Sequence, residues 1–288
     1  MPLLVPETKK RFPKPEPWRL AGREFDWGAR TYVMGILNVT PDSFSDGGRL
    51  DPEAAIAHAL RMIADGADLI DVGGESTRPG CEGVTAQVEL ERILPVVRAL
   101  ADKGIVLSVD TFKPEVADRA LHAGAALIND ISGLRDPEML AVAKRHQAPV
   151  IAMHMQGTPQ TMQRDPRYAD VVSEVREALE AAARHARDMG VQVMVDPGIG
   201  FGKTQEHNLA LLRHLNRLHV AGCPMLLGTS RKGFIGNLLG LPVNERVEGT
   251  MATVALAVSQ GVDVVRVHDV KEASRTVRVA DAIVRGKQ

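Results

Sequence analysis

A polar segment from Asn38 to Gly48 holds several groups that can do chemistry. It reads Asn-Val-Thr-Pro-Asp-Ser-Phe-Ser-Asp-Gly-Gly and contains one amide, two carboxylates and three hydroxyls. The apolar run Tyr32–Asn38 leads into it and is typical of a core strand, so the polar groups begin where that strand ends. The same change from an apolar run to Asp, Asn, His, Lys or Arg recurs along the chain. This pattern predicts that reactive groups gather at one end of a parallel sheet.

Polar groups end each of the predicted strands. They are Asn38, Asp71 with Glu75, Asp110, Asn129, His154, Asp196, Ser230-Arg231-Lys232, and Arg266 with His268. Burying such groups without partners costs several kcal/mol each, so their convergence indicates a ligand. Taken alone, Asp71 or His154 is more often a satisfied core group.

The mixture of residue types narrows the ligand. Asp110, Asn129 and Asp196 offer two carboxylates and an amide, which suit a flat heterocycle with several N–H donors, such as an aminopyrimidinone. A second set offers donors for an anion and comprises Asn38, Thr77, Arg78, Arg266 and His268. One ligand with a donor-rich ring and a phosphate tail satisfies both sets. Asn38 and Asp46 could also give oxygen ligands to Mg2+, which binds phosphates through few protein groups.

Other motifs lack support in the residues. Gly198–Thr204 resembles the end of a phosphate-binding loop, but that motif requires glycine at position 197, where this chain has Pro197. The same segment makes no convincing dinucleotide fingerprint. The chain has no HExxH and no GxSxG, which leaves zinc hydrolysis and serine acyl transfer without support. Lys232 could form a Schiff base, or act as a charged hydrogen-bond donor opposite the carboxylates.

Composition excludes several classes of protein. The chain has 288 residues, 44% hydrophobic and 25% charged, with a net charge of -1, which is ordinary for a globular protein with a sizeable core. The balanced charge argues against nucleic acid or an acidic membrane surface as a partner. Cys81 and Cys223 stand in no metal-ligand spacing, so we interpret both as structural residues of a reducing compartment. Residues 1–20 lack an apolar signal core and no run approaches the ~20 residues that span a bilayer, so we expect a cytoplasmic protein.

Strand and helix patterns alternate after an opening segment. The segment to about Arg30 is rich in proline and predicts an irregular arm or short hairpin, anchored by Trp18 and Trp27. The predicted strands are Tyr32–Asn38, Asp68–Gly73, Ile105–Asp110, Ala126–Asn129, Val150–His154, Gln192–Asp196, Met225–Gly228 and Asp263–His268. The predicted helices are Pro52–Asp65, Thr85–Asp102, Pro114–Ala123, Pro137–His146, Tyr168–Met189, Glu206–Leu218, Asn244–Gln260 and Val270–Val284.

Eight strand–helix units in roughly 260 residues predict an α/β fold of the (β/α)8 (TIM) barrel type, since an open doubly wound sheet usually has fewer strands. No linker or shift in composition marks a second domain. We therefore expect an N-terminal arm over residues 1–30 and a single barrel over residues 31–288. Such a barrel builds its active site at the carboxyl ends of the strands.

The motifs resemble those of the dihydropteroate synthase family, pterin-binding enzymes that join a pterin to 4-aminobenzoate in folate biosynthesis. The matching segments are Asn38–Gly48, Asp71–Gly80, Ser108–Thr111, Ile128–Ser132, Met153–His154, Asp196–Lys203, Ser230–Lys232 and Arg266–Asp269. They cover nearly the whole chain in the order of the family, which is far more specific than any single motif.

The resemblance implies a role for each site residue. It places the pterin ring against Asp110, Asn129, Met153, Asp196, Lys232 and Arg266. It places the diphosphate against Asn38, Thr77, Arg78, Arg266 and His268, with Mg2+ at Asn38 and loop closure at Asp46. It places 4-aminobenzoate against Thr77, Arg78, Phe201, Lys232 and Gly233. Many relatives have serine where this chain has Gly233, although the N–H groups of a helix beginning there could still bind the carboxylate.

The resemblance also implies the reaction. Diphosphate leaves the pterin methylene carbon and the arylamine then attacks, with Asp110, Lys232 and Arg266 as the catalytic residues and a homodimer as the expected assembly. Two alternatives stay open. A non-catalytic pterin-binding paralogue would keep the ring pocket and lose the diphosphate site. A pterin-dependent methyltransferase shares the ring-holding residues, but does not need the Asn38 loop, Ser230–Lys232 or Arg266–His268.

Overall fold

The computed structural model describes residues 14–40, 45–46, 49–76, 80–81 and 83–286. The strands are β1 Trp18–Leu20, β2 Arg23–Phe25, β3 Tyr32–Asn38, β4 Ser45–Asp46, β5 Arg49–Leu50, β6 Leu69–Gly73, β7 Leu107–Asp110, β8 Leu127–Asp130, β9 Val150–Met153, β10 Val193–Asp196, β11 Leu226–Gly228 and β12 Val264–Val267. The helices are α1 Pro52–Ala64, α2 Ala86–Ala101, α3 Pro114–His122, α4 Pro137–His146, α5 Val171–Asp188, α6 Gln205–Arg213, α7 Gly233–Leu239, α8 Val247–Ser259 and α9 Val270–Arg285, with 3-10 turns η1 Leu215–Arg217 and η2 Val243–Glu245.

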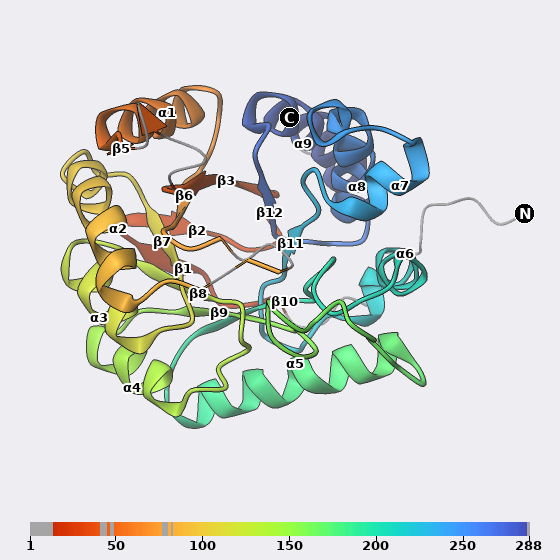
Figure 1. The fold of residues 1–288 in the computed structure, drawn as a ribbon. Coiled ribbons are helices and arrows are strands. Elements are labelled where there is room, and N and C mark those ends of the chain that lie inside the picture. The colour runs from red at the N-terminus through yellow and green to blue at the C-terminus, as the bar shows by residue number, and fades with distance from the viewer. Residues whose placement is uncertain (1–13, 41–44, 47–48, 77–79, 82, 287–288) are drawn as a thin grey trace, which may run out of the picture.

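A closed parallel sheet forms the centre of the molecule. In the described part of the chain, eight strands pair in the order β10-β9-β8-β7-β6-β3-β12-β11. The two ends of that order meet, because Val195 of β10 forms a parallel bridge with Met225 beside β11. Helices surround the strands (Figure 1). The predicted α/β class and (β/α)8 TIM barrel are confirmed.

The barrel interior is apolar at the amino ends of the strands and polar at their carboxyl ends. One buried cluster includes Met34, Leu69, Val106, Leu127, Ile151, Met194, Leu226 and Val264. Side chains alternate between the two faces of a strand, so residues two positions further along face the same interior. Those residues include Asp71, Ser108, Asn129, Asp196 and Arg266. The same strands therefore carry an apolar floor and the polar groups above it.

Local signals begin the helices outside the barrel. Side-chain oxygens of the N-cap residues Asp51, Thr85, Asp136, Asp170 and Thr204 accept backbone N–H groups of α1, α2, α4, α5 and α6. Each such cap contributes ~1 kcal/mol to stability. The buried faces of the helices then pack on the outer faces of the strands in one continuous apolar core.

The β1–β2 hairpin covers the amino ends of the barrel strands. Trp18 and Trp27 are 4% and 1% exposed, and their ring centroids lie 5.2 Å apart. Phe25 and Tyr32 pack against Trp27 and belong with it to the apolar cluster of the barrel interior. The predicted hairpin and its two tryptophan anchors are confirmed.

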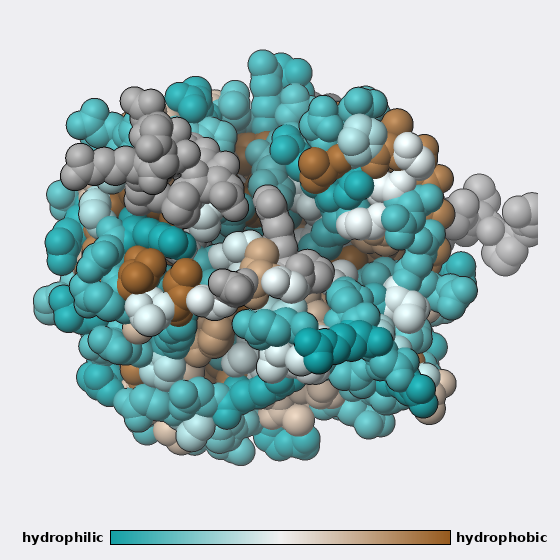
Figure 2. Space-filling view, in the orientation of Figure 1, coloured by the Kyte–Doolittle hydropathy of each residue, from teal (hydrophilic) through white to brown (hydrophobic). Residues whose placement is uncertain are grey.

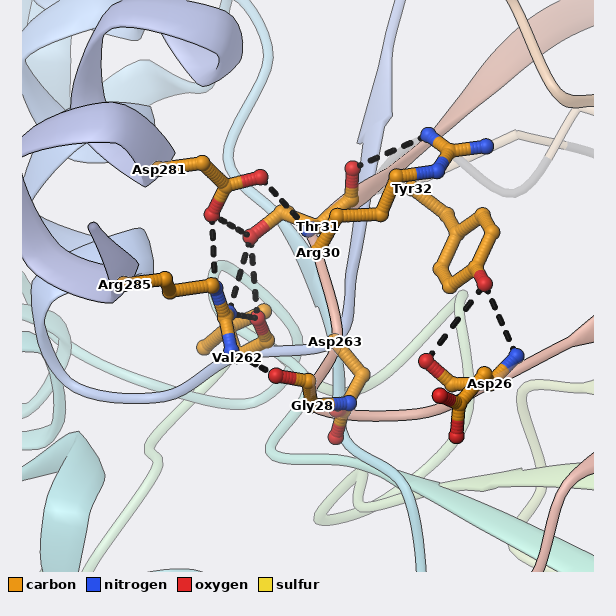
Figure 3. Close-up of polar contacts among 9 residues, drawn as sticks. All are labelled: Asp26, Gly28, Arg30, Thr31, Tyr32, Val262, Asp263, Asp281 and Arg285. Carbon is orange, nitrogen blue, oxygen red and sulfur yellow. Dashed lines mark hydrogen bonds and ion pairs between the residues drawn. The ribbon is translucent and has the colours of Figure 1, made fainter. Parts of the chain in front are cut away.

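A polar network joins the residues after the hairpin to the last helix (Figure 3). Asp281 of α9 accepts hydrogen bonds from the Thr31 amide and from Arg285 Nε, each at 2.7 Å. Arg285 also donates to the Gly28 carbonyl at 2.9 Å, and Asp263 accepts from the Gly28 amide at 3.0 Å. These bonds fasten the amino end of the barrel, opposite the end where the strands terminate.

Three predicted helices have wrong boundaries. The prediction Tyr168–Met189 begins too early, because α5 starts at Val171 after its N-cap Asp170. The pattern predicts Asn244–Gln260 as one helix, whereas α8 begins at Val247 after η2, and the separate short helix α7 precedes both. A left-handed glycine, Gly240 with φ of 67°, ends α7 and produces this break. The predicted helix Glu206–Leu218 likewise stops at Arg213 and continues as η1.

No helix in the described ranges is long and apolar enough to cross a membrane.

Candidate active site

A cavity of about 880 Å3 opens at the carboxyl ends of the strands. Its walls come from the carboxyl ends of β3, β7 and β12 and from the segments after β6, β9, β10 and β11. They include the predicted site residues Asn38, Asp110, Phe201, Lys232, Gly233, Arg266 and His268. The cavity lies where a (β/α)8 barrel builds its active site, so the structure brings these residues together as expected.

The Arg266 guanidinium lies between two carboxylates. Its Nε donates to Asp71 Oδ2 at 2.6 Å and its Nη2 donates to Asp110 Oδ2 at 2.7 Å. Asp71 is completely buried and also accepts a 2.8 Å hydrogen bond from Asn129 Nδ2. Asp71 therefore connects Arg266 and Asn129, two of the residues predicted to bind the pterin ring.

Asp110 has a free acceptor at the pocket. Its Oδ1 is buried, and no group in the described ranges gives it a hydrogen bond. Burial raises the pKa of Asp110 to about 7 against the opposing effect of Arg266, and the neighbouring Asp71 carboxylate adds to the rise. A buried acceptor without a partner is costly, so an N–H donor from a ligand would relieve this cost.

Asp196 and Lys232 supply an acceptor and a donor from the ends of the neighbouring strands β10 and β11. Asp196 ends β10 and accepts a 2.7 Å hydrogen bond from the Gly198 amide. Burial raises the pKa of Asp196, while the Lys232 ammonium opposes the shift. Burial lowers the pKa of Lys232 to about 8 against the attraction of Asp196, and its Nζ donates to the Ile199 carbonyl. The pair suits a heterocycle edge that carries both N–H and carbonyl groups.

An apolar wall adjoins this ammonium. The Phe201 ring centroid lies 4.7 Å from Lys232 Nζ, which is cation–π distance. Phe201 packs against a buried cluster that contains Met153 and Met162. Gly233 is the first residue of α7, and a Cβ added there would meet nothing within 4 Å. Phe201 and the first turn of α7 therefore line the same cavity.

Donors for an anion gather at β3 and β12. Asn38 ends β3 and is half-buried, and β3 pairs directly with β12. The Ser230 hydroxyl lies 2.9 Å from His268 Nδ1 and accepts from the His268 amide at 3.1 Å, which fixes the imidazole. Together with Arg266, these groups can meet a diphosphate.

The side chains of three predicted site residues are not described in the structure. Thr77 and Arg78 fall outside the described residues. Of Asp46, in β4, only the backbone is described, and it pairs with Arg49 of β5. No group of three or more His, Cys, Asp or Glu side chains that could hold a metal occurs in the described ranges.

The sequence does not indicate the contacts of several residues that shape the site. Asp71 is recognisable as a charged residue inside an apolar strand, although the sequence does not indicate its contact with Arg266. Met162 and Gln163 line the cavity from the long loop after β9, and no sequence signal marks them. His154 binds Lys203 at 3.0 Å, and that pair is likewise visible only in the structure.

Known proteins provide an independent comparison. The model of the family described as pterin binding enzyme matches residues 34–268. A dihydropteroate synthase of a Synechocystis species is 51% identical over 281 residues, covering 95% of this chain and 96% of that protein. The Yersinia pestis dihydropteroate synthase, solved as a sulfonamide drug complex, has a TM-score of 0.88 and 44% identity over 94% of this chain and all of that one.

A second solved structure that is similar to this one contains 4-aminobenzoic acid. The Xanthomonas albilineans dihydropteroate synthase, solved with 4-aminobenzoic acid, has a TM-score of 0.86 and 45% identity, covering 93% of this chain and 97% of that one. The resemblance seen in the motifs is confirmed by sequence and by fold. This chain belongs to the dihydropteroate synthase family of pterin-binding enzymes.

Proposed function

We propose that this protein is a transferase of folate biosynthesis. It condenses 6-hydroxymethyl-7,8-dihydropterin pyrophosphate with 4-aminobenzoate to give 7,8-dihydropteroate and diphosphate. The observation that carries the proposal is the unpartnered, buried Asp110 Oδ1 beside Arg266 in a cavity that also presents Asn38 and His268. The cavity thus offers acceptors for a ring and donors for an anion, as this substrate requires.

The pterin ring would lie over the polar end of the barrel interior. Asp110 and Asp196 would accept its N–H groups, and Asn129, held by Asp71, would present its amide edge. Lys232 would donate another of its three N–H groups to the ring carbonyl while it keeps its bond to the Ile199 carbonyl. Met153 would contact a ring face from the neighbouring apolar cluster.

The diphosphate would bind at the ends of β3 and β12, against Asn38, Arg266 and His268, with Thr77 and Arg78 from the loop after β6. Mg2+ fits this arrangement, because it usually binds through one or two protein oxygens and the phosphates themselves. Asn38 is half-buried and lines the cavity, and its single amide oxygen matches so small a protein contribution. When bound there, the ion would supply positive charge to the departing diphosphate.

Bond breaking comes first. The bond between the methylene carbon and the diphosphate oxygen breaks, and its electron pair leaves with the diphosphate, where Arg266 and His268 stabilise the growing negative charge. The pterin delocalises the positive charge left on carbon, and Asp110 as a carboxylate stabilises it further. The protein supplies no nucleophile.

Arylamine attack follows. The 4-aminobenzoate ring would stack beside Phe201 with its carboxylate near Lys232 and the first turn of α7, which begins at Gly233. Its amine nitrogen bonds to the methylene carbon and then loses a proton to solvent or diphosphate. Closure of the loop that contains Asp46 would keep water from the cation.

A homodimer is part of the proposal. Leu238 and Leu239 of α7, Val243 of η2 and Leu256 of α8 are between 49% and 57% exposed. Figure 2 shows apolar surface where Figure 1 places α7 and α8. Apolar surface of this kind commonly marks a protein interface. Sedimentation equilibrium measures the mass of the assembly.

A cytoplasmic location and the domain division belong to the proposal as well. Cys81 and Cys223 are both free thiols, as expected in a reducing compartment. Residues 31–288 form the proposed barrel domain, and residues 1–30 form the proposed arm.

The decisive experiment is diphosphate release from dihydropterin pyrophosphate with Mg2+, measured with and without 4-aminobenzoate. Chromatography of the products identifies dihydropteroate. Release that depends on 4-aminobenzoate and yields the conjugate supports the synthase. Pterin binding without release would instead indicate a non-catalytic paralogue, and methyl transfer to a corrinoid would indicate a methyltransferase.

A further inference from the structure

The Lys203 side chain occupies a buried position that the proposed reaction does not use. It is 2% exposed and lies one residue before Thr204, the N-cap of α6. Its Nζ donates to the Phe201 carbonyl at 2.9 Å, to His154 Nδ1 at 3.0 Å and to the His154 carbonyl at 3.2 Å. An ammonium has three N–H donors, so all of them are used.

These hydrogen bonds join the two loops that follow the neighbouring strands β9 and β10. His154 follows β9, and Phe201 lies in the loop after β10. The loops also touch directly, because a Cβ added to Gly198 would lie 1.9 Å from the His154 carbonyl oxygen. Gly198 has a φ of +65°, so both the space and the backbone require glycine there. Lys203 therefore holds a loop that is already packed closely against its neighbour.

Charge reinforces the contact. Burial lowers the pKa of His154 to about 3, and the positive charges of Lys203 and Arg135 add to this shift. The imidazole is therefore neutral, and its Nδ1 can accept a hydrogen bond. Burial lowers the pKa of Lys203 to about 7, which the Asp196 carboxylate opposes and Lys232 reinforces. A neutral lysine would lose one of its three donated hydrogen bonds.

The loop that Lys203 holds sets the position of Lys232. The Ile199 carbonyl accepts a hydrogen bond from Lys232 Nζ, and the Phe201 ring lies 4.7 Å from the same atom. A Cβ added to Gly200 would lie 3.0 Å from Lys232 Cδ. Three successive positions of one loop thus surround the lysine that is proposed to bind both substrates.

We propose that Lys203 and His154 form a positioning pair, which fixes the loop of residues 197–202 and through it Lys232 and Phe201. In this proposal the pair contacts neither the methylene carbon of the pterin nor the amine nitrogen of 4-aminobenzoate. Its role rests on the proposed function, since Lys232 and Phe201 are assigned there to the pterin and to 4-aminobenzoate.

The variants for the test are Lys203→Met, His154→Leu and His154→Asn. Methionine keeps much of the length of lysine without the ammonium, and leucine removes the Nδ1 acceptor. Asparagine places an amide oxygen near the position of Nδ1, so it keeps an acceptor for Lys203. The matched control is Arg285→Met, which removes another buried cation with several hydrogen bonds, at the opposite end of the barrel.

We expect Lys203→Met and His154→Leu to raise the KM for 4-aminobenzoate about tenfold or more. Lys232 and Phe201, which are proposed to bind this substrate, would no longer be held in place. Hydrogen exchange at the amides of Gly200 and Phe201 should become faster in both. His154→Asn should stay close to the unsubstituted protein. Arg285→Met should lower Tm while leaving this KM and these amides unchanged.

Two results would overturn the inference. One is a folded Lys203→Met protein with unchanged KM and unchanged exchange; the other is an equal rise in KM for Arg285→Met. If the unsubstituted protein forms no dihydropteroate, the proposed function fails. The exchange at Gly200 and Phe201 then still decides whether Lys203 holds the loop.

Discussion

Arg266 Nε donates a 2.6 Å hydrogen bond to Oδ2 of Asp71, a carboxylate 195 residues earlier in the chain. Asp71 is completely buried, whereas Arg266 reaches the cavity and also binds Asp110. Removing one partner of a buried ion pair is strongly destabilising, because it leaves the other charge uncompensated. The orientation of the guanidinium at the proposed diphosphate site therefore depends on Asp71.

Replacing Asp71 by asparagine should lower kcat/KM for the pterin pyrophosphate about 100-fold, or about 3 kcal/mol. The amide keeps an acceptor oxygen and removes the charge that holds Arg266. Steady-state kinetics at saturating 4-aminobenzoate measure the effect. The control is Asp263→Asn, a buried carboxylate at the amino end that accepts from the Gly28 and Met225 amides. The Asp263→Asn variant should have a lower Tm, and its kcat/KM should change less than about twofold. Equal losses of kcat/KM in the two variants would contradict the role given to Asp71.

Replacing Asp110 by asparagine should reduce turnover much more than pterin affinity. The carboxylate is proposed to stabilise the cation formed after diphosphate departure, and removing one such electrostatic group typically costs about 100-fold in kcat. Asparagine keeps an acceptor for the pterin ring, so affinity should change by less than about tenfold. Single-turnover kinetics and calorimetric titration measure the two quantities separately. Equal losses in both would reject the electrostatic role.

The pH dependence of kcat/KM should be bell-shaped. Burial raises the pKa of Asp110 to about 7, so the carboxylate forms and activity rises as pH increases through that value. Burial lowers the pKa of Lys232 to about 8, so the ammonium loses its proton and activity falls above that value. Asp110→Asn should remove the acidic limb.

A control separates Lys203 from Lys232. Burial lowers the pKa of Lys203 to about 7, so its titration overlaps these limbs. The pH profile is therefore repeated with Lys203→Arg, whose side chain stays charged. A basic limb that remains near pH 8 in this variant then belongs to Lys232.

Replacing Gly233 by serine should be tolerated and should lower the KM for 4-aminobenzoate severalfold. The Cβ meets open space, and the residue begins α7 beside the proposed carboxylate position. A serine hydroxyl there adds a donor to the backbone N–H groups. Thermal unfolding checks the fold, and steady-state kinetics give the KM. An increased KM would show that the carboxylate binds elsewhere.

Removing Mg2+ with a chelator should suppress diphosphate release, and adding Mg2+ should restore it. Asn38→Ala should raise the Mg2+ concentration needed for half-maximal activity by about tenfold, because one of few protein oxygens is lost. Asn38→Asp, which keeps an oxygen and adds charge, should lower it. A response to Mg2+ that is the same in all three proteins would place the ion away from Asn38.

The sequence predicts most of the barrel because its strand and helix patterns are local. Apolar runs and Pro or Gly boundaries suffice for the β3 strand and the α1 helix, whose predicted ends agree within one residue. They do not suffice after β11, where Gly240 ends one helix and η2 delays the next. Short helices of this kind depend on packing against their neighbours, which a local pattern does not contain.

The chain by itself determined the type of chemistry, since Asp110, Asn129, Asp196, Lys232 and Arg266 stand at strand ends and closure of the sheet brings strand ends together. The tertiary structure decided which of these groups bind each other. Arg266 contacts Asp71 and Asp110 across the barrel, and Lys203 contacts His154 from the next loop, over separations of 49 to 195 residues. Such pairings depend on distances of about 3 Å between side chains, which follow from the register and closure of the barrel and leave no mark in the local sequence.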